Sequence, residues 1–218
     1  MKTALLFDLD GTLLNTLQDL ADATNYALAQ FRLPARTLEE VRTFVGNGAA
    51  RLIDRALPGL PSDPPAQEVL AVFQTYYRAN CQVATAAYEG IPEVLEALGK
   101  HYPMAIVSNK PDLAVKRLCA QYFPGIYARG ESTDCPRKPA PDMVFRAMEA
   151  LGADRCIYIG DSEVDVLTAK NAGVPCLSVL WGFRGREEIA AAGGKFFCEK
   201  PELLPQKIQE ILGELHGK

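Results

Sequence analysis

The sequence has almost no histidine, which excludes several common hydrolase mechanisms. Among its 218 residues, only His101 and His216 are histidines. His216 lies in a polar C-terminal tail, and His101 lies in a turn-like stretch without a nucleophile motif beside it. A Ser-His-Asp or Cys-His mechanism would have to depend on His101 and is not indicated. Any acid–base catalysis therefore falls to carboxylates or lysine.

The sequence also has no excess of positive charge. It contains 23 Lys and Arg residues against 27 Asp and Glu residues, for a net charge of −4. This balance argues against nucleic acid or an anionic membrane as the partner. The apolar run that ends at Phe7 is too short for a signal peptide or a membrane span. We therefore expect a cytoplasmic protein that acts, as a monomer or homodimer, on a small molecule.

Closely spaced cysteine pairs are missing as well. The six cysteines are scattered without any C-x-x-C pair, and Cys156 and Cys176 fall inside apolar, strand-like runs. This distribution is typical of reduced, packed thiols and not of a zinc site or a disulfide framework.

Short apolar runs alternate with helical stretches along most of the chain. The runs, typical of buried parallel strands, are residues 3–7, 104–108, 156–160, 175–180 and, more weakly, 195–198. The stretches between them have the length of crossover helices and include residues 111–121, 141–151 and 164–172. This alternation predicts an α/β fold with a doubly wound, Rossmann-like parallel sheet.

A helical pattern replaces that alternation between residues 16 and 87. The expected helices comprise residues 17–31, a segment that begins with a capping box at Thr37, residues 49–57 and residues 68–81, with a breaker-rich segment at 58–65. We expect a helical cap domain at residues 16–87, inserted into a core catalytic domain of residues 1–15 and 88–218. The insertion follows the first strand, where a cap could cover a site at the strand's carboxyl end.

The first strand leads directly into Asp8-Leu9-Asp10-Gly11-Thr12. In an open parallel sheet ligands gather at the carboxyl ends of the strands, so both carboxylates should line the binding crevice. The backbone N–H groups of Gly11 and Thr12 could face an anion in the tight turn that follows. Taken alone, an Asp-rich turn could equally cap the next helix.

Other strand ends carry chemistry that matches this turn. The strand at 104–107 is followed by Ser108-Asn109-Lys110, and the strand at 156–159 by a segment with Asp161 and Asp165. Lys138 lies in a proline-rich loop between them. We expect these side chains to converge on one edge of the sheet with the first two aspartates.

Such a set suits phosphoryl transfer to a carboxylate. A carboxylate nucleophile repels an incoming phosphate, so a divalent cation and a cationic side chain must offset the charge. Aspartates suit Mg²⁺, a hard ion that prefers oxygen ligands. The ammonium of Lys138 can neutralise both the nucleophile and the phosphate, and the Ser108 hydroxyl can hold phosphate oxygens.

Together these motifs resemble the haloacid dehalogenase superfamily of phosphotransferases, in the family's order and over almost the whole chain. The resemblance implies that Asp8 is the nucleophile and forms an aspartyl phosphate. It implies that Asp10 protonates the leaving group and then activates the hydrolytic water. Ser108 would hold the transferred phosphoryl group with support from Asn109.

The resemblance also implies a cofactor and its ligands. Mg²⁺ would be bound by the side chains of Asp8 and Asp161 and by the backbone carbonyl of Asp10. Asp165 would lie behind the metal ligands and hold Lys138 or a metal-bound water.

Two branches of the superfamily do not fit. The dehalogenases lack the second aspartate of the first motif, which is present here as Asp10. Phosphonoacetaldehyde hydrolases need a cap lysine for a Schiff base, and no lysine occurs between Lys2 and Lys100. Phosphoglycolate phosphatase, pyrophosphatase, sugar-phosphate phosphatase and β-phosphoglucomutase remain, each acting on a small phosphorylated metabolite.

Residues 44–52, together with 88–95 and 181–183, are similar to phosphoglycolate phosphatases. Asn47 and Gly48 lead into a helix whose N-terminal amides can receive an anion, and Arg51 lies in its first turn. We expect a substrate carboxylate to dock there. The alternative is an ordinary helix start with a surface arginine. An alternative of another class is a non-catalytic binding module on the same fold, although every expected catalytic position is filled.

Overall fold

The computed structural model describes residues 1–57 and 65–216, and the chain divides into two compact units. The first unit comprises residues 1–14 and 87–218, and the second comprises residues 15–86. The expected boundaries, 16–87, differ from these by one residue at each end. Most of the expected breaker-rich segment, residues 58–64, lies outside the described residues.

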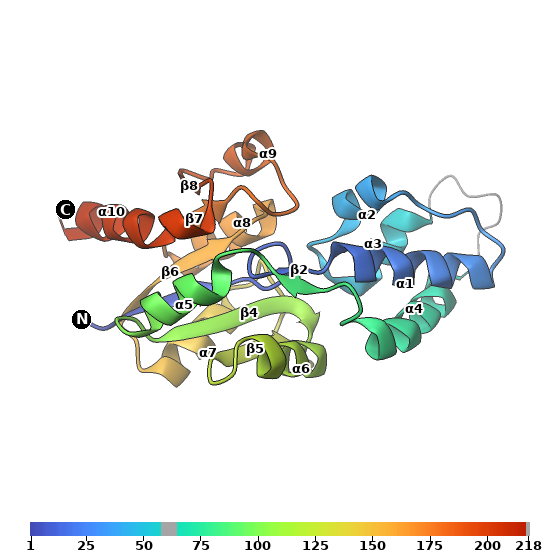
Figure 1. Cartoon of the computed structure of the whole chain (residues 1–218), viewed down its shortest axis with the longest axis horizontal. Helices are drawn as coiled ribbons and strands as arrows, with labels where there is room; N and C mark the ends of the chain where they lie inside the picture. Colours follow the sequence, from blue (N-terminus) through green and yellow to red (C-terminus); the bar gives the residue numbers. More distant parts are fainter. Residues whose placement is uncertain (58–64, 217–218) are drawn as a thin grey trace. The chain divides into compact units, whose positions relative to one another are not determined.

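The first unit is built on a six-stranded sheet with the order β5-β4-β1-β6-β7-β8. All its neighbouring strands are parallel, which confirms the doubly wound α/β fold (Figure 1). The strands are β1 (Thr3–Phe7), β4 (Met104–Pro111), β5 (Tyr127–Glu131), β6 (Arg155–Gly160), β7 (Cys176–Val179) and β8 (Phe196–Cys198). The central strand β1 is buried along its whole length.

Helices cover both faces of this sheet, as the alternation along β1 requires. Leu5 and Phe7 belong to one apolar cluster, and Ala4 and Leu6 belong to another, because successive strand residues point to opposite faces. The first cluster includes residues of α5 (Ile91–Gly99), α6 (Asp112–Tyr122) and α10 (Leu204–His216). The second includes residues of α7 (Asp142–Leu151) and α8 (Glu163–Ala172). A short helix, α9 (Arg186–Ala191), and a 3₁₀ turn, η1 (Pro201–Leu203), complete the unit.

Strand β5 was not predicted from the sequence. It is an edge strand with the sequence Tyr-Ala-Arg-Gly-Glu, and four of its five residues are only partly buried. An edge strand with charged residues has no continuous apolar run, so the pattern that finds buried strands misses it.

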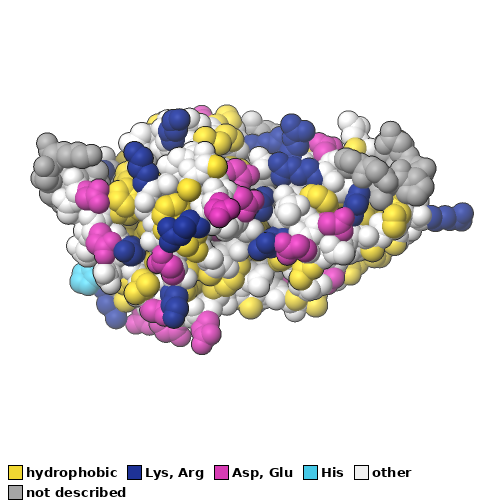
Figure 2. All heavy atoms as spheres, turned by 90° about the horizontal axis from the view of Figure 1, so that it is seen from above, with side chains coloured by type: hydrophobic (Ala, Val, Ile, Leu, Met, Phe, Trp, Pro, Cys, Tyr) yellow, Lys and Arg dark blue, Asp and Glu magenta, His cyan; other side chains and the backbone are white. Residues whose placement is uncertain are grey.

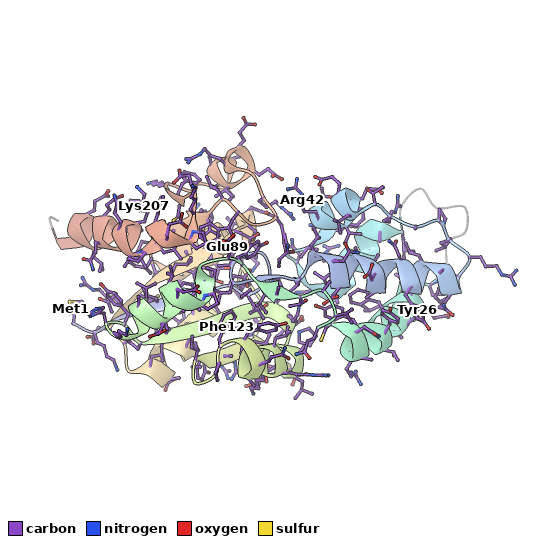
Figure 3. The ribbon with its side chains drawn as sticks, in the orientation of Figure 1. Met1, Tyr26, Arg42, Glu89, Phe123 and Lys207 are labelled. Atoms are coloured by element: carbon purple, nitrogen blue, oxygen red, sulfur yellow. The ribbon has the colours of Figure 1, made fainter. Side chains whose placement is uncertain are left out.

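The second unit is helical and contains α1 (Leu17–Gln30), α2 (Leu38–Phe44), α3 (Gly48–Ala56) and α4 (Ala66–Asn80). Thr37 and Glu40 form the expected capping box at the start of α2. Tyr26 of α1, which is labelled in Figure 3, stacks on Tyr76 of α4, and their ring centroids are 4.1 Å apart. This contact adds to the packing of α1 against α4.

The chain enters and leaves the helical unit through two short strands, β2 (Leu14–Asn15) and β3 (Ala86–Ala87), which pair with each other. Within the helical unit, the buried carboxylate of Asp19 accepts hydrogen bonds from the N–H groups of Ala84 and Thr85 and from the Thr85 hydroxyl. These bonds tie the start of α1 to the segment that leaves the unit.

Charges of both signs are interspersed on the face shown in Figure 2, in keeping with the small net charge. No helix in residues 1–57 or 65–216 combines the length and the apolar character needed to cross a membrane.

Candidate active site

The site begins where β1 ends. Asp8 follows Phe7 directly, is almost fully buried, and its N–H donates to the carbonyl of Ile159 on β6 at 2.8 Å. Its backbone therefore continues the sheet, and its side chain stands at the carboxyl edge of the strand, where parallel sheets bind ligands.

The turn after Asp8 closes on itself. Gly11 has a φ of +84°, and a Cβ at this position would lie 2.3 Å from the Asp161 carboxylate, so only glycine fits. The N–H groups of Gly11 and Thr12 donate to the carbonyls of Leu14 and Leu9, so both already have acceptors in this structure. The Thr12 hydroxyl donates to Asp161 Oδ1 at 3.1 Å. The turn thus packs against Asp161 instead of presenting these two amides outward.

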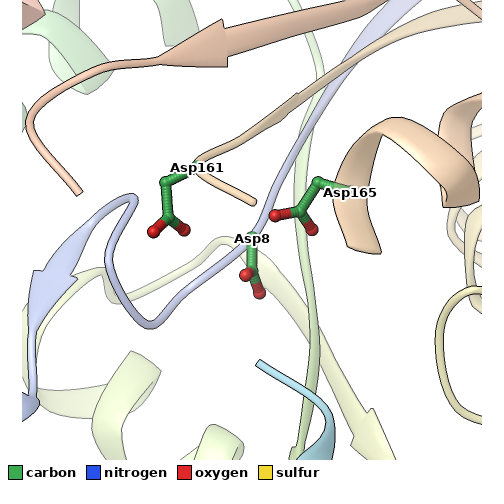
Figure 4. Close-up of side chains that lie close together, drawn as sticks. All are labelled: Asp8, Asp161 and Asp165. Atoms are coloured by element: carbon green, nitrogen blue, oxygen red, sulfur yellow. The ribbon is translucent and has the colours of Figure 1, made fainter. Parts of the chain in front are cut away.

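Three buried carboxylates lie together at this edge: Asp8 after β1, Asp161 after β6 and Asp165 in the first turn of α8 (Figure 4). One carboxylate oxygen from each lies within 4.8 Å of the others. Oxygen ligands in this arrangement suit a hard divalent cation.

Lys138 lies among these carboxylates. Its Nζ is 2.8 Å from Asp8 Oδ1 and 2.8 Å from Asp165 Oδ1, and its side chain is 2% exposed. Burial lowers the pKa of Lys138, but the charges of Asp165 and Asp8 outweigh this effect and raise the pKa well above its ordinary value. The ammonium is therefore permanently charged and lies beside the expected nucleophile.

One ammonium does not balance three carboxylates. Burial raises the pKa of Asp8 well above its ordinary value, and the charges of Asp165 and Asp161 add to the rise, while Lys138 opposes it. Burial, followed by the charge of Asp165, raises the pKa of Asp161 to about 7. Asp8 Oδ1 is buried and has no hydrogen-bond partner among the described residues, although Lys138 lies close to it. A bound cation would meet this excess of negative charge, so the cluster fits a metal ion.

Asp165 differs from the other two carboxylates because each of its oxygens already accepts two hydrogen bonds from the protein. Oδ1 accepts from Lys138 and, at 3.3 Å, from the Tyr158 hydroxyl, and Oδ2 accepts from the N–H and hydroxyl of Ser162. Asp161 accepts one hydrogen bond at each oxygen, from the Thr12 hydroxyl and from the Phe183 N–H, and Asp8 Oδ1, beside the Lys138 ammonium, accepts no hydrogen bond within residues 1–57 and 65–216. These contacts favour Asp8 and Asp161 as the metal ligands and place Asp165 as the partner of Lys138.

Strand β4 supplies the remaining polar groups of the site. It continues through Ser108, Asn109 and Lys110 to Pro111, three residues beyond its expected end. Asn109 accepts from the Lys138 N–H at 2.7 Å and donates to the Lys138 carbonyl at 3.0 Å, so in this structure its amide holds the lysine. The Ser108 hydroxyl lies 3.4 Å from Asp10 Oδ2.

Sequence reasoning assigned no role to Lys110, which forms an ion pair with Asp10. Its Nζ lies 2.6 Å from Asp10 Oδ1, and its side chain is 5% exposed. The sequence feature that could have indicated a role for Lys110 is the alternation of side chains along a strand. This alternation places residues 108 and 110 on one side and residue 109 on the other. This signal becomes visible only if the strand is extended past Ser108.

The segment after β7, residues 181–183, carries a resemblance to phosphoglycolate phosphatases in the sequence but no predicted contact. The Trp181 indole N–H donates to the Thr12 carbonyl at 3.0 Å, and the Phe183 N–H donates to Asp161 Oδ2 at 2.7 Å. Between them, a Cβ on Gly182 would lie 2.4 Å from the Asp161 Cβ and 2.4 Å from the Gly11 carbonyl oxygen. This segment therefore fixes the position of Asp161 against the first turn.

The three residues expected to bind a substrate carboxylate lie in the helical unit. Asn47 precedes α3, Gly48 begins it, and Arg51 lies one turn along it. The Arg51 side chain is 64% exposed, and its guanidinium lies 3.7 Å from Asp54. An exposed ion pair at this distance contributes little to stability, so the guanidinium can exchange partners at small cost.

The sequence profile of the haloacid dehalogenase-like hydrolases matches residues 5–179. The chain belongs to this family. It is 36% identical over 219 residues to the phosphoglycolate phosphatase of Pseudomonas fluorescens (strain Pf0-1), across 95% of this chain and 77% of the relative. It is 33% identical over 196 residues to that of Photorhabdus laumondii subsp. laumondii, across 86% of this chain and 84% of the relative.

A solved structure is similar over nearly the whole chain. It is a protein from Lactobacillus delbrueckii subsp. bulgaricus, assigned as a phosphoglycolate phosphatase, that superposes with a TM-score of 0.88 at 36% sequence identity. The match covers 94% of this chain and 97% of that one.

Proposed function

We propose that this enzyme, a phosphatase of the haloacid dehalogenase family, hydrolyses phosphoglycolate through a phosphorylated Asp8. The observation that carries the proposal is the position of Lys138, 2.8 Å from the Asp8 carboxylate, within a buried cluster of carboxylates. The names of the relatives in Pseudomonas and Photorhabdus support the substrate.

In the first half of the reaction, a carboxylate oxygen of Asp8 attacks the phosphorus. The bond between phosphorus and the leaving oxygen breaks, and the proton of the Asp10 carboxyl passes to that oxygen. Lys138 reduces the repulsion between the carboxylate and the phosphate, and the Ser108 hydroxyl would hold a phosphoryl oxygen. Glycolate leaves with the proton.

In the second half, Asp10 takes a proton from water, and the water oxygen attacks the phosphorus. The bond between phosphorus and Asp8 breaks, which regenerates the carboxylate and releases inorganic phosphate. The same residue thus acts first as acid and then as base.

The metal of this site is proposed to be Mg²⁺. The side chains of Asp8 and Asp161 and the backbone carbonyl of Asp10 would hold it. When bound, it supplies positive charge to the carboxylates and to the phosphoryl oxygens, which lowers the repulsion between them. The raised pKa values of Asp8 and Asp161 support a cation here, because they reflect negative charge without sufficient compensation.

Substrate choice is proposed to rest on the helical unit. The amides at the start of α3 and the exposed guanidinium of Arg51 would receive the carboxylate of phosphoglycolate while its phosphate reaches Asp8.

The test is a substrate comparison with the purified enzyme in Mg²⁺ and then in EDTA. Phosphoglycolate, an aryl phosphate, pyrophosphate and a sugar phosphate are compared by kcat/KM. We expect the highest value for phosphoglycolate and loss of turnover in EDTA. A higher value for pyrophosphate or the sugar phosphate would give the corresponding alternative activity, and no turnover of any of them would favour the non-catalytic alternative.

A further inference from the structure

A second buried lysine lies in the site and is separate from Lys138. Lys110 is 6% exposed, and its ammonium pairs with Asp10 at 2.6 Å. Lysine is almost never buried unless it is paired, because removing the ammonium from water is costly. The burial of Lys110 is therefore tied to the carboxylate that it contacts.

The direction of the Lys110 side chain follows from its place in β4. Ser108 and Lys110 are two residues apart in β4, at the point where its register with β5 shifts, and both side chains reach Asp10. Asn109, between them, holds Lys138. Three consecutive residues thus serve the two catalytic aspartates separately, because Lys138 contacts Asp8 and Lys110 contacts Asp10.

The backbone that carries Lys110 is itself fixed. Pro111 pairs with Glu131 of β5, and the Gly130 N–H donates to Asp112 Oδ1 at 2.9 Å. A Cβ on Gly130 would lie 2.4 Å from the Lys110 carbonyl oxygen, so the two strands are in close contact here. Lys110 therefore extends toward a carboxylate in a turn from a bulge of β4 that is in close contact with β5.

We propose that Lys110 is a positioning residue, which holds the Asp10 carboxylate where it can exchange a proton first with the leaving oxygen and then with water. The inference rests on the proposed function and adds a second lysine to it. The Asp10 side chain is 14% exposed, and its 2.6 Å ion pair with the buried ammonium of Lys110 opposes rotation of the carboxylate toward solvent. Positioning errors of this kind are costly in catalysis.

The substitution Lys110→Met keeps the length of the side chain and removes the ammonium. We expect kcat on phosphoglycolate to fall by roughly tenfold to a hundredfold with KM nearly unchanged, in line with the loss of one charge-assisted contact. Formation of the phosphoenzyme from p-nitrophenyl phosphate should fall much less, because nitrophenolate leaves without a proton, while hydrolysis of the phosphoenzyme should be slow for both substrates. The matched control is Lys100→Met, which removes an exposed lysine paired with Glu96 of α5 and should change none of these rates.

A double-mutant cycle shows whether Lys110 acts through Asp10. In an Asp10→Asn background, Lys110→Met should cause no further loss, because the group that it positions is gone. An additive loss, or a rise in KM with kcat retained, would overturn the proposal, because Lys110 would then act elsewhere or bind the phosphate directly. If the Met variant does not fold, as judged by circular dichroism, Lys110→Arg and Lys110→Gln replace it. The Arg variant should retain more turnover than the Gln variant, and equal losses would contradict positioning by charge.

A failure of the proposed covalent mechanism can be told apart from a failure of the inference on Lys110. If Asp8→Asn retains turnover, or Asp10→Asn alone is as active as the unmodified enzyme, the covalent mechanism is wrong whatever Lys110 does. If both variants are inactive but the Lys110 variants are not impaired, only the present inference fails.

Discussion

Asn109 holds the main chain of Lys138 from both sides, with its Oδ1 accepting from the Lys138 N–H and its Nδ2 donating to the Lys138 carbonyl. All these groups are buried. The position of the lysine that contacts Asp8 is therefore set by a residue of β4, 29 positions earlier in the chain.

Asn109→Ala should reduce both stability and turnover. It leaves a buried N–H and a buried carbonyl without their partner, which costs roughly 2–5 kcal/mol of the free energy of unfolding. Chemical denaturation measures this loss, and kcat reports the displacement of Lys138. The control is Asn171→Ala, which removes a hydrogen bond to the neighbouring Pro139 carbonyl in an exposed position. It should cost less than about 1 kcal/mol and leave kcat unchanged. Equal effects of the two substitutions would contradict the role of Asn109.

Asp8→Asn should abolish turnover without loss of folding. The substitution keeps the shape of the side chain but removes the nucleophile. It also removes a buried carboxyl group for which ionisation is unfavourable, because burial raises its pKa. The thermal midpoint of the metal-free variant should therefore equal or exceed that of the unmodified protein at neutral pH. Turnover above a trace in the purified variant would show that the covalent mechanism is wrong.

The metal-free protein should lose stability as the pH rises from about 4 to about 7. The pKa of Asp161 is about 7 in the folded protein and 3.8 ordinarily, so in this window the folded state binds more protons than the unfolded state. Asp8 contributes in the same direction. Lys138 does not make stability depend on pH in this range. Its ordinary pKa already lies above the range, and the fold raises that pKa further.

Mg²⁺ should therefore raise the thermal midpoint more at pH 8 than at pH 5, because protons compete with the ion for the carboxylates. The measurement is thermal unfolding in EDTA and in excess Mg²⁺ at both pH values. Asp161→Asn is the control variant, and it should show a smaller pH dependence and a smaller effect of Mg²⁺. An equal effect of Mg²⁺ at both pH values would argue against binding at this cluster.

Gly182→Ala should weaken metal binding and activity. The new methyl group would lie 2.4 Å from both the Asp161 Cβ and the Gly11 carbonyl oxygen, so either the carboxylate or the first turn must move. Overpacking of this kind costs roughly 1–3 kcal/mol. The matched control is Gly213→Ala in α10, where a Cβ meets nothing within 4 Å. That substitution should raise stability by roughly 0.5–1 kcal/mol, because alanine favours the helix. Unchanged Mg²⁺ dependence in the Gly182 variant would contradict the argument.

Arg51→Ala should damage turnover of phosphoglycolate far more than turnover of an aryl phosphate, which has no carboxylate. A charge-assisted contact to the substrate carboxylate contributes about 1.5–3 kcal/mol, so kcat/KM should fall by roughly tenfold to a hundredfold for phosphoglycolate alone. Arg42→Ala removes another partly exposed arginine of the helical unit, paired with Glu39, and is the control. Equal losses on both substrates would assign Arg51 to the structure of the unit, and no loss on either would favour a surface arginine.

The sequence predicted the parts of the fold and site that short patterns encode. Buried strands such as β1 and β6 are continuous apolar runs, and a parallel sheet brings the residues after them to one edge, so the meeting of Asp8 and Asp161 follows from topology. The helical insertion was visible because the spacing of its apolar residues changes after Asn15.

The remaining features depend on geometry that such patterns do not contain. The partner of Lys110 could not be predicted while β4 was expected to end at Ser108. The role of Gly182 depends on the close approach of two backbones far apart in the sequence. The binding of a substrate carboxylate at α3 stays a prediction, and in the structure the Arg51 guanidinium lies beside Asp54.

The way in which the helical unit is attached has an evolutionary consequence. The chain enters and leaves it on paired strands, β2 and β3, and Asp19 joins the two ends of the unit internally through Ala84 and Thr85. Because paired strands lie about 5 Å apart, a graft at this point requires only that the ends of the new segment be adjacent. The residues between the two strands can thus be exchanged as a single cassette. Under the proposed role of the helical unit in substrate choice, recombination at Asn15 and Ala86 would exchange that choice while the carboxylate cluster and both lysines are inherited unchanged.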